Sequence, residues 1–324
     1  MNQTQTSIVT SVQRLDTFIA NLLNETRNQS AQLIKQGAIT VDGKSVTKVG
    51  LKLKLEQVIM ITFPEQQITP ALKVNFDVEI LFEDDDVLVI NKPSGVTVHP
   101  APSVKEATLV DWLKKKNIRL STISGEERHG IVHRLDKGTS GVMVIAKNNE
   151  SHEALSLQLQ DKTMGRYYLA ISTPPLKNTF MEVDLPIARN ANNRLKMAVA
   201  NHGKSAKTHF RQLLLSEDEK SDLLLCKLFT GRTHQIRVHL ESMSRHILGD
   251  HIYGVSQLKT KVERILLHAS VLYFVHPTTK EIVTFHAPLP TEMQNYLEKY
   301  FNVETLDETI NPNTLEHHFA DISV

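Results

Sequence analysis

The polar run at residues 128–141 contains Asp136, the aspartate best placed in this sequence to do chemistry. The apolar stretches around it predict strands at Ile131–Arg134 and Val142–Ala146, with Asp136 at the apex of the turn between them. Loops carried on rigid strands concentrate functional side chains, and a carboxylate there indicates carboxylate chemistry. Aspartate is also a common turn-capping residue, so composition alone leaves a purely structural role open.

Metal-assisted and nucleotide-dependent chemistry have little support in the sequence. His129 and His133 are four apart, as ligands on one helical face would be, but the residues between them are typical of a strand. His234 and His239 have the wrong spacing for one helical face, and there is no His-Glu-x-x-His motif. Glycine-rich nucleotide-binding motifs, Walker motifs and a hydrolase serine elbow are also absent. We therefore predict no metal and no cofactor.

The composition of the 324-residue chain fits a two-domain protein of a reducing compartment. Its 37 basic and 36 acidic residues give a formal net charge of +1, so a nucleic-acid surface would have to be a local patch. The single cysteine, Cys226, excludes an internal disulfide and a cysteine-rich zinc site. The first residues lack the apolar core of a signal peptide, and no run of 18 apolar residues occurs. We expect a soluble, cytoplasmic protein without a membrane partner.

The N-terminal part of the chain predicts a small helix-helix-hairpin module at residues 1–62, with its core at 13–61. Apolar residues at helical spacing predict two short helices, and Asp42-Gly43 between apolar stretches predicts a hairpin. Residues 1–62 hold seven basic and four acidic side chains, a modest basic bias. Residues 63–75 carry two prolines and little periodicity, as a linker does.

Residues 76–300 predict a larger α+β domain. Further strands are expected at 87–91, 167–171, 209–215, 223–229, 266–274 and 282–285, and helices at 106–116, 151–162, 232–242 and 290–300. Short turns join strand to strand more often than strands alternate with helices, which favours a mixed, largely antiparallel sheet with peripheral helices. Residues 301–324 contain five acidic and no Lys or Arg side chains, and we expect a mobile acidic tail in which Leu315 and Phe319 could dock.

Five ordered motifs resemble the RluA-type pseudouridine synthases. His133-Arg-Leu-Asp-Lys-Gly-Thr-Ser-Gly141 matches the active-site motif of that family. The others are Asn91-Lys-Pro-Ser-Gly95 with Val98-His-Pro100, Arg166-Tyr-Tyr-Leu-Ala170, Thr230-Gly-Arg-Thr-His-Gln-Ile-Arg-Val-His239, and Leu248-Gly-Asp250 followed by Leu267-His-Ala269. Residues 13–60 resemble the RNA-binding module shared with a ribosomal small-subunit protein, and this pairing is characteristic of the RluD-like branch.

The resemblance implies a pseudouridine synthase fold and the isomerisation of uridine to pseudouridine in structured RNA. This reaction breaks the glycosidic carbon-nitrogen bond, turns the uracil and rejoins it through carbon-5, so it needs no cofactor. The family's one required aspartate corresponds to Asp136 here. Attack on the anomeric carbon, attack on the ring and removal of a sugar proton all remain open for this carboxylate.

The resemblance also gives roles to four other residues. Arg134 would fill the gap left by a flipped nucleotide, and in a strand it would share a face with Asp136. Arg232 would pair with the catalytic aspartate, and Ile236 would pack against the uracil. Tyr168 would stack on the uracil and help remove the carbon-5 proton, while its neighbour Tyr167 would point to the opposite face of its strand.

The implied partner is structured RNA, with large-subunit ribosomal RNA favoured over transfer RNA, and we expect a monomer. Two other functions remain open at this point. A ribosome assembly factor would bind RNA without turnover, and a nucleosidase would cleave the same bond and release uracil. The mass of the RNA product separates isomerisation from cleavage, because isomerisation leaves the mass unchanged.

Overall fold

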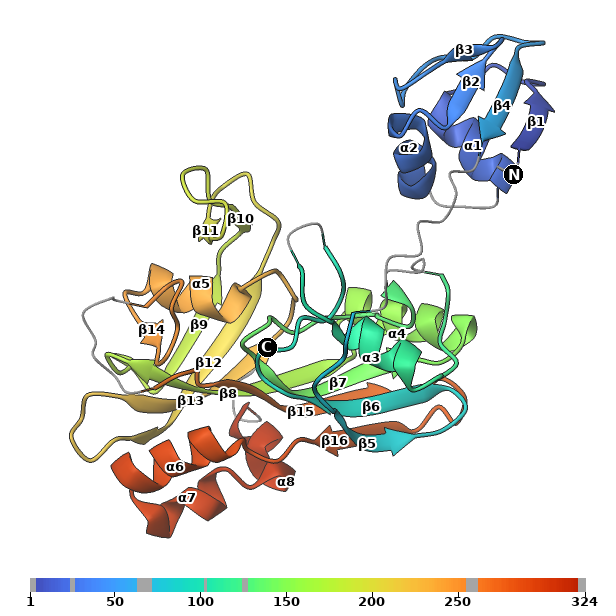
Figure 1. Ribbon diagram of the computed structural model, residues 1–324. Helices are drawn as coiled ribbons and strands as arrows, with labels where there is room; N and C mark the ends of the chain where they lie inside the picture. Colours follow the sequence, from blue (N-terminus) through green and yellow to red (C-terminus); the bar gives the residue numbers. More distant parts are fainter. Residues whose placement is uncertain are drawn as a thin grey trace. The chain divides into compact units, whose positions relative to one another are not determined.

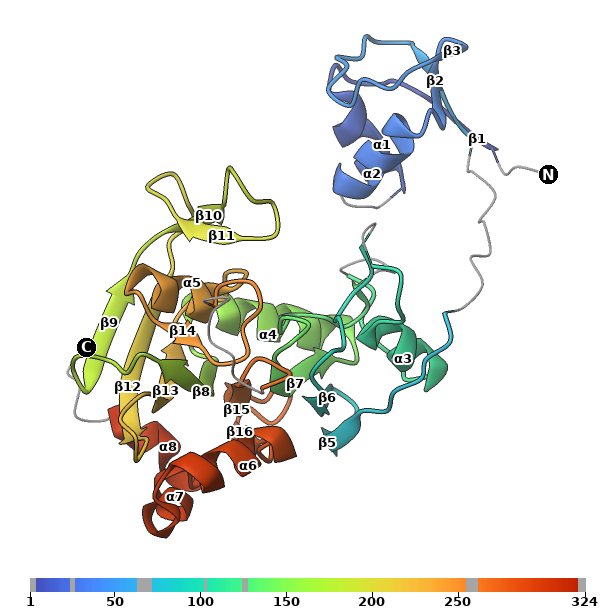
Figure 2. The same cartoon turned by 60° about the vertical axis from the view of Figure 1, so that its left-hand side comes forward.

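The computed structural model describes residues 4–23, 27–62, 72–101, 104–123, 128–254 and 262–319. The chain divides into two compact units, Met1–Ala71 and Leu72–Val324, and each is described by itself (Figures 1 and 2). Most of the predicted linker, residues 63–71, lies outside the described residues. Among the described helices, none is both long and apolar enough to cross a membrane.

The N-terminal unit packs two helices on a small antiparallel sheet. Its elements are β1 (Thr4–Ile8), α1 (Leu15–Leu23), α2 (Arg27–Lys35), β2 (Ile39–Val41), β3 (Lys44–Ser45) and β4 (Val58–Thr62), with strand order β1-β4-β2-β3. Asp42 and Gly43 both have positive φ, 51° and 76°, as a two-residue hairpin turn requires. Leu15, Ile19 and Ile34 are fully buried, so the apolar faces of both helices close the core. Strand β1 was not predicted from the sequence.

The second unit is built on one large mixed sheet. The strands are β5 (Glu79–Glu83), β6 (Val87–Lys92), β7 (Ser140–Ala146), β8 (Gly165–Thr173), β9 (Phe180–Asp184), β12 (Lys207–Leu215), β13 (Asp222–Leu228), β14 (His246–Ile247), β15 (Leu267–Val275) and β16 (Ile282–His286). Their order is β5-β6-β7-β15-β8-β13-β12-β9, with β14 also paired to β8 and β16 to β15. The pairing of β7 with β15 is parallel, and the other pairings of this sheet are antiparallel. The predicted mixed, largely antiparallel sheet is confirmed.

Helices cover both faces of this sheet, as Figures 1 and 2 show. The helices α3 (Leu109–Lys115), α4 (Asn149–Asp161) and α5 (Gln235–Ser242) pack on the face that carries Tyr168. The helices α6 (Thr291–Tyr300), α7 (Val303–Thr309) and α8 (Pro312–Leu315) cover the face that carries Tyr167. A small hairpin, β10 (Ile187–Arg189) and β11 (Met197–Val199), extends from the sheet between β9 and β12.

The expected mobile tail is wrong for residues 301–319. These residues form α7, α8 and a 3₁₀ turn (Glu316–Phe319), which pack on the large sheet. Leu306, Leu315 and Phe319 are at most 6% exposed, and the Phe319 ring stacks on Tyr167 at 6.0 Å. Burial of these apolar side chains outweighs the repulsion between the acidic groups, of which Glu304, Asp307 and Glu308 are exposed.

The predicted strand at Ile131–Arg134 is also wrong, because only Ile131 makes a bridge, to Ile145, and the chain then runs irregularly to Thr139. The imidazole of His133 accepts the backbone N–H of Val144 through Nε2 at 3.1 Å. The His133 side chain therefore accepts the N–H of Val144 in place of the backbone carbonyl of a paired strand. Arg134 and Asp136 consequently do not share a strand face.

Candidate active site

One pocket of the second unit brings together all five residues singled out from the sequence. Its lining includes Arg134, Asp136, Tyr168, Arg232 and Ile236, which come from three segments far apart in the chain. Arg166, Gly231, His234 and Arg237 line the same pocket. The irregular segment before β7, strand β8 and the start of α5 therefore meet at Asp136.

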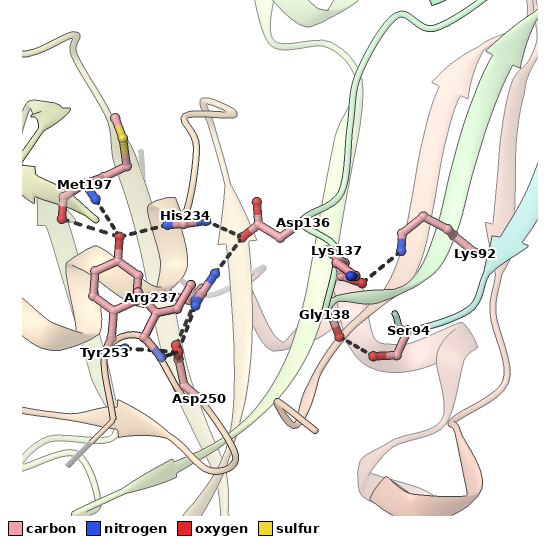
Figure 3. Close-up of polar contacts among 11 residues, drawn as sticks. Lys92, Ser94, Asp136, Lys137, Gly138, Met197, His234, Arg237, Asp250 and Tyr253 are labelled. Atoms are coloured by element: carbon pink, nitrogen blue, oxygen red, sulfur yellow. Dashed lines mark hydrogen bonds and ion pairs between the residues drawn. The ribbon is translucent and has the colours of Figure 1, made fainter. Parts of the chain in front are cut away.

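The loop that carries Asp136 is held by side chains of the segment 92–95, which lie beside it (Figure 3). Lys92 is fully buried, and its ammonium donates to the carbonyls of Pro93 and Val96 and approaches that of Lys137 at 3.5 Å. Ser94 Oγ donates to the Gly138 carbonyl at 2.7 Å. Burial lowers the pKa of Lys92 to about 7, while the Asp136 carboxylate favours its charged form. These bonds hold the backbone carbonyls of Lys137 and Gly138, directly after Asp136, in place.

Arg237, on the first turns of α5, is the arginine that pairs with Asp136. Its Nη1 lies 3.3 Å from Asp136 Oδ2, and its Nε and Nη2 bind Asp250 at 2.7 and 2.8 Å (Figure 3). Burial acts to raise the pKa of Asp250, but the hydrogen bond and the charge of Arg237, together with the backbone N–H groups of Tyr253 and Ile252, outweigh it and hold that pKa below its usual value. Asp136 thus faces a guanidinium that Asp250 orients from behind.

The predicted pair between Arg232 and Asp136 is not formed. Arg232 precedes the helix, and its Nε donates to the Ser205 carbonyl at 2.9 Å. The Gln235 side chain closes the turn by accepting the Arg232 N–H at 2.9 Å and the Thr230 hydroxyl at 2.7 Å. This turn directs Arg232 toward the pocket wall and leaves Arg237, five residues further on and within α5, to meet the carboxylate.

A histidine and a tyrosine link Asp136 to the small hairpin. His234 has a left-handed backbone, with φ of 58°, and its Nε2 lies 3.9 Å from Asp136 Oδ2. Its Nδ1 is 2.8 Å from the hydroxyl of Tyr253, which also accepts the N–H of Met197 on β11 at 2.7 Å. Burial raises the pKa of Tyr253 to about 12 and lowers that of His234. Both groups are therefore neutral at pH 7, and the chain of contacts runs from the hairpin to the carboxylate.

The two adjacent tyrosines of β8 point to opposite faces of the sheet. Tyr168 lines the pocket and packs in the same apolar cluster as Ile236, whereas Tyr167 packs with Phe319 under the C-terminal helices. Burial raises the pKa of Tyr168, and the guanidinium of Arg166 counteracts part of that rise. The phenol of Tyr168 is therefore protonated at neutral pH.

Comparisons with known proteins identify the family of this chain. The RNA pseudouridylate synthase family model matches residues 86–242, and the S4 domain model matches residues 13–59. An uncharacterized RNA pseudouridine synthase of Helicobacter pylori strain J99 is 46% identical, over 96% of this chain and 97% of that protein. This chain belongs to the RNA pseudouridine synthase family. It is an RNA-modifying isomerase whose N-terminal unit carries an S4 domain.

Further relatives agree with this membership. The ribosomal large subunit pseudouridine synthase D of Zymomonas mobilis is 37% identical, over 87% of this chain and 92% of its own length. The human protein RNA pseudouridylate synthase domain containing 4 superimposes with a TM-score of 0.53 at 26% identity, covering 68% of this chain and 92% of its own. The human protein RNA pseudouridylate synthase domain containing 1 has the same fold, with a TM-score of 0.57 at 22% identity. The match covers 74% of this chain and 97% of the human one.

Away from the pocket of this pseudouridine synthase, Asp84, Asp86 and His276 form a possible metal-ligand group, the one such group among the residues that the structure describes. His276 Nε2 already bonds Asp84 at 2.8 Å, and its Nδ1 accepts the N–H groups of Thr278 and Thr279. Since both ring nitrogens are engaged, these contacts fit a structural hydrogen-bond cluster.

Sequence reasoning missed three residues beside Asp136: His234, Arg237 and Tyr253. A signal for Arg237 was present, because it lies between Ile236 and Val238 in a helix that also contains Leu240. A charge embedded in an apolar helical stretch is buried and needs a partner of opposite sign. The contacts of Tyr253 depend on loop geometry, which the local sequence pattern does not indicate.

Proposed function

We propose that this enzyme isomerises uridine to pseudouridine in large-subunit ribosomal RNA, with Asp136 as the catalytic carboxylate. One observation carries the proposal: five residues selected from three separate sequence motifs, Asp136 among them, line a single pocket. The substrate RNA is proposed from the relative named ribosomal large subunit pseudouridine synthase D, at 37% identity, and from the S4 domain.

The geometry supports a role for Arg237 and Asp250 in holding the Asp136 carboxylate. This carboxylate is 17% exposed, so a ribose can reach it, and the Arg237 guanidinium lies 3.3 Å from its Oδ2. Whichever of the three routes the carboxylate takes, that charge must be held in place while the glycosidic bond breaks. The bond from Arg237 to Asp250 keeps the guanidinium from turning away.

The remaining pocket residues fit the handling of a flipped base. Ile236 and Tyr168 offer an apolar wall on which uracil can stack. Arg134 is exposed, with Nη1 3.4 Å from His99 Nε2, and we assign it to the gap that the nucleotide leaves. Arg232 borders the pocket and is assigned to the substrate rather than to Asp136.

The test is turnover on ribosomal RNA labelled with tritium at carbon-5 of uridine, because rejoining through carbon-5 releases that hydrogen. The purified enzyme should release tritium from the labelled RNA and leave the mass of unlabelled RNA unchanged, and Asp136→Asn should abolish release while RNA binding stays within a few fold. The matched control is Asp218→Asn, an exposed aspartate of the same unit that lies outside this pocket. Turnover retained by Asp136→Asn overturns the assignment of the carboxylate.

The same assay separates the two other functions. Release of free uracil would indicate a nucleosidase, and tight binding without tritium release would indicate an assembly factor. Mapping of pseudouridine in total RNA with and without the gene then identifies the uridines and decides between ribosomal and transfer RNA. The proposal also includes a monomeric, cytoplasmic enzyme, which light scattering and cell fractionation check.

A further inference from the structure

Arg166 has a property that its neighbours in the pocket lack. Its side chain is buried, with 8% of the residue exposed, yet its Nε has no hydrogen-bond partner. Across the described residues, the guanidinium forms no hydrogen bond and no ion pair with a carboxylate. A buried charge without compensation is costly, so a ligand that supplied the missing partner would be bound favourably.

The position of Arg166 directs this charge into the substrate pocket. Arg166 lies two residues before Tyr168 on β8, so the two side chains share a face of the strand, and both line the pocket. Gly231 faces the guanidinium from the start of the motif at residues 230–239. A Cβ at that position would come within 2.7 Å of Arg166 Nη1, so glycine leaves the space that the guanidinium occupies.

The charge around the pocket favours an anion as the missing partner. Four arginines line it, Arg134, Arg166, Arg232 and Arg237, against the single carboxylate of Asp136. Asp250 neutralises Arg237 from behind, which leaves the other arginines to attract negative charge. Burial lowers the pKa of Arg166, but a guanidinium remains protonated at neutral pH.

We propose that Arg166 binds a phosphate of the RNA strand next to the flipped uridine, and so fixes the depth at which that nucleotide enters the pocket. This inference rests on the proposed function, because it takes RNA as the ligand. A phosphate carries a full negative charge and two oxygens that match the guanidinium fork, whereas uracil offers only neutral carbonyls and an N–H. Arg166 is thus a substrate-binding residue distinct from those that contact the reacting carboxylate.

The experiment compares Arg166→Met with Arg211→Met. Arg211, on β12 of the same sheet, also has a buried Nε without a partner, but it lies outside the pocket near His318. Each variant is assayed for RNA affinity over a range of salt, for the single-turnover rate at saturating RNA, and for melting temperature. The RNA is the ribosomal fragment that contains the mapped uridine or, where mapping finds none, a fragment of large-subunit ribosomal RNA that wild type binds.

Arg166→Met should bind this fragment about 10- to 100-fold more weakly, the value of hydrogen bonds to a charged group. The slope of log affinity against log salt should fall by ~0.7–0.9, the contribution of one phosphate. The rate at saturating RNA should change by only a few fold. The free protein should melt no lower than wild type, because an uncompensated buried charge has been removed. Arg211→Met should leave affinity and salt slope unchanged.

Two further measurements locate the contact. Replacing the phosphates on either side of the uridine with neutral methylphosphonates, one at a time, should weaken binding by wild type at one position and cause no further loss in Arg166→Met. Gly231→Ala should displace the guanidinium, and should weaken binding in wild type but not in the Arg166→Met background.

Other results overturn the inference. Unchanged affinity with a slower saturating rate would assign the guanidinium to the departing uracil or to Tyr168, and a large drop in melting temperature would make Arg166 a structural residue. Because binding is measured without turnover, the proposed function can fail on its own. In that case wild type forms no pseudouridine in ribosomal RNA, while the change in salt slope persists.

Discussion

Replacing Arg237 by methionine tests the arrangement around Asp136 most directly. The substitution keeps much of the side-chain volume and removes the charge shared by Asp136 and Asp250. Breaking a buried ion pair by removing one partner costs ~3–5 kcal/mol. Asp250 would retain the backbone N–H groups of Ile252 and Tyr253, at 2.9 and 3.1 Å, so we expect the lower end, about 3 kcal/mol. For a unit of this size that corresponds to a melting temperature lower by ~6–12 °C.

The pH dependence of this loss has a definite sign. In wild type, Arg237 holds the pKa of Asp250 below its unfolded value, so the stabilisation is present above that value and is lost as the pH falls through the folded pKa. In Arg237→Met the buried Asp250 loses its cation, and desolvation raises its pKa above the unfolded value. The variant therefore gains stability from protonation as the solution is acidified. The difference in melting temperature should be largest near pH 7 and should narrow toward pH 4.

Calorimetry from pH 4 to pH 8, together with single-turnover tritium release, measures both consequences. The double variant Arg237→Met with Asp250→Asn removes the orphaned charge and should recover much of the stability. It should remain inactive, because Asp136 still lacks the guanidinium that holds it. A normal melting temperature and near-normal turnover in Arg237→Met would refute the reasoning, as would a stability deficit that does not change with pH.

Two further predictions concern the base and the N-terminal unit. Tyr168→Phe should keep RNA binding and lose ~100-fold or more in single-turnover rate, the range for a general base, while Tyr167→Phe on the opposite face stays active. Because burial raises the pKa of Tyr168, the wild-type rate should rise with pH above neutrality, and a flat profile would contradict this role. Deleting residues 1–62 should weaken RNA binding and flatten its salt dependence, and an unchanged salt slope would show that the S4 domain does not anchor the RNA.

The sequence predicted the elements whose pattern is local. The alternating and apolar runs of β8, β13 and β15 and the turn pair Asp42-Gly43 gave strands and a hairpin at the observed places. Strands β1 and β9 escaped prediction because they are short edge strands, whose formation depends on pairing with β4 and β12 rather than on their own pattern.

The C-terminal segment shows why net charge is a poor guide to order. Its five acidic residues suggested a solvated tail. The apolar side chains that pack the segment against the sheet are few and widely spaced in the sequence. Leu306, Leu315 and Phe319 find a prepared surface in Tyr167 and the buried residues of α6. The energy gained on docking depends on that surface, part of which is built by β8, more than 100 residues earlier in the chain.

The site could be predicted as a set of residues but not as a set of pairs. The choice between Arg232 and Arg237 depends on where α5 begins, and that point is fixed by tertiary contacts. His234, just before the helix, has a left-handed backbone, and its ring lies between the Tyr253 hydroxyl and Asp136. The Gln235 amide, which donates to the Lys207 carbonyl and the Thr208 hydroxyl, then anchors the first turn to β12. With the helix started there, Arg232 lies outside it, and Arg237 reaches both carboxylates. Sequence motifs therefore identify the residues that line the pocket. The turn and the helix start between them determine which arginine pairs with Asp136.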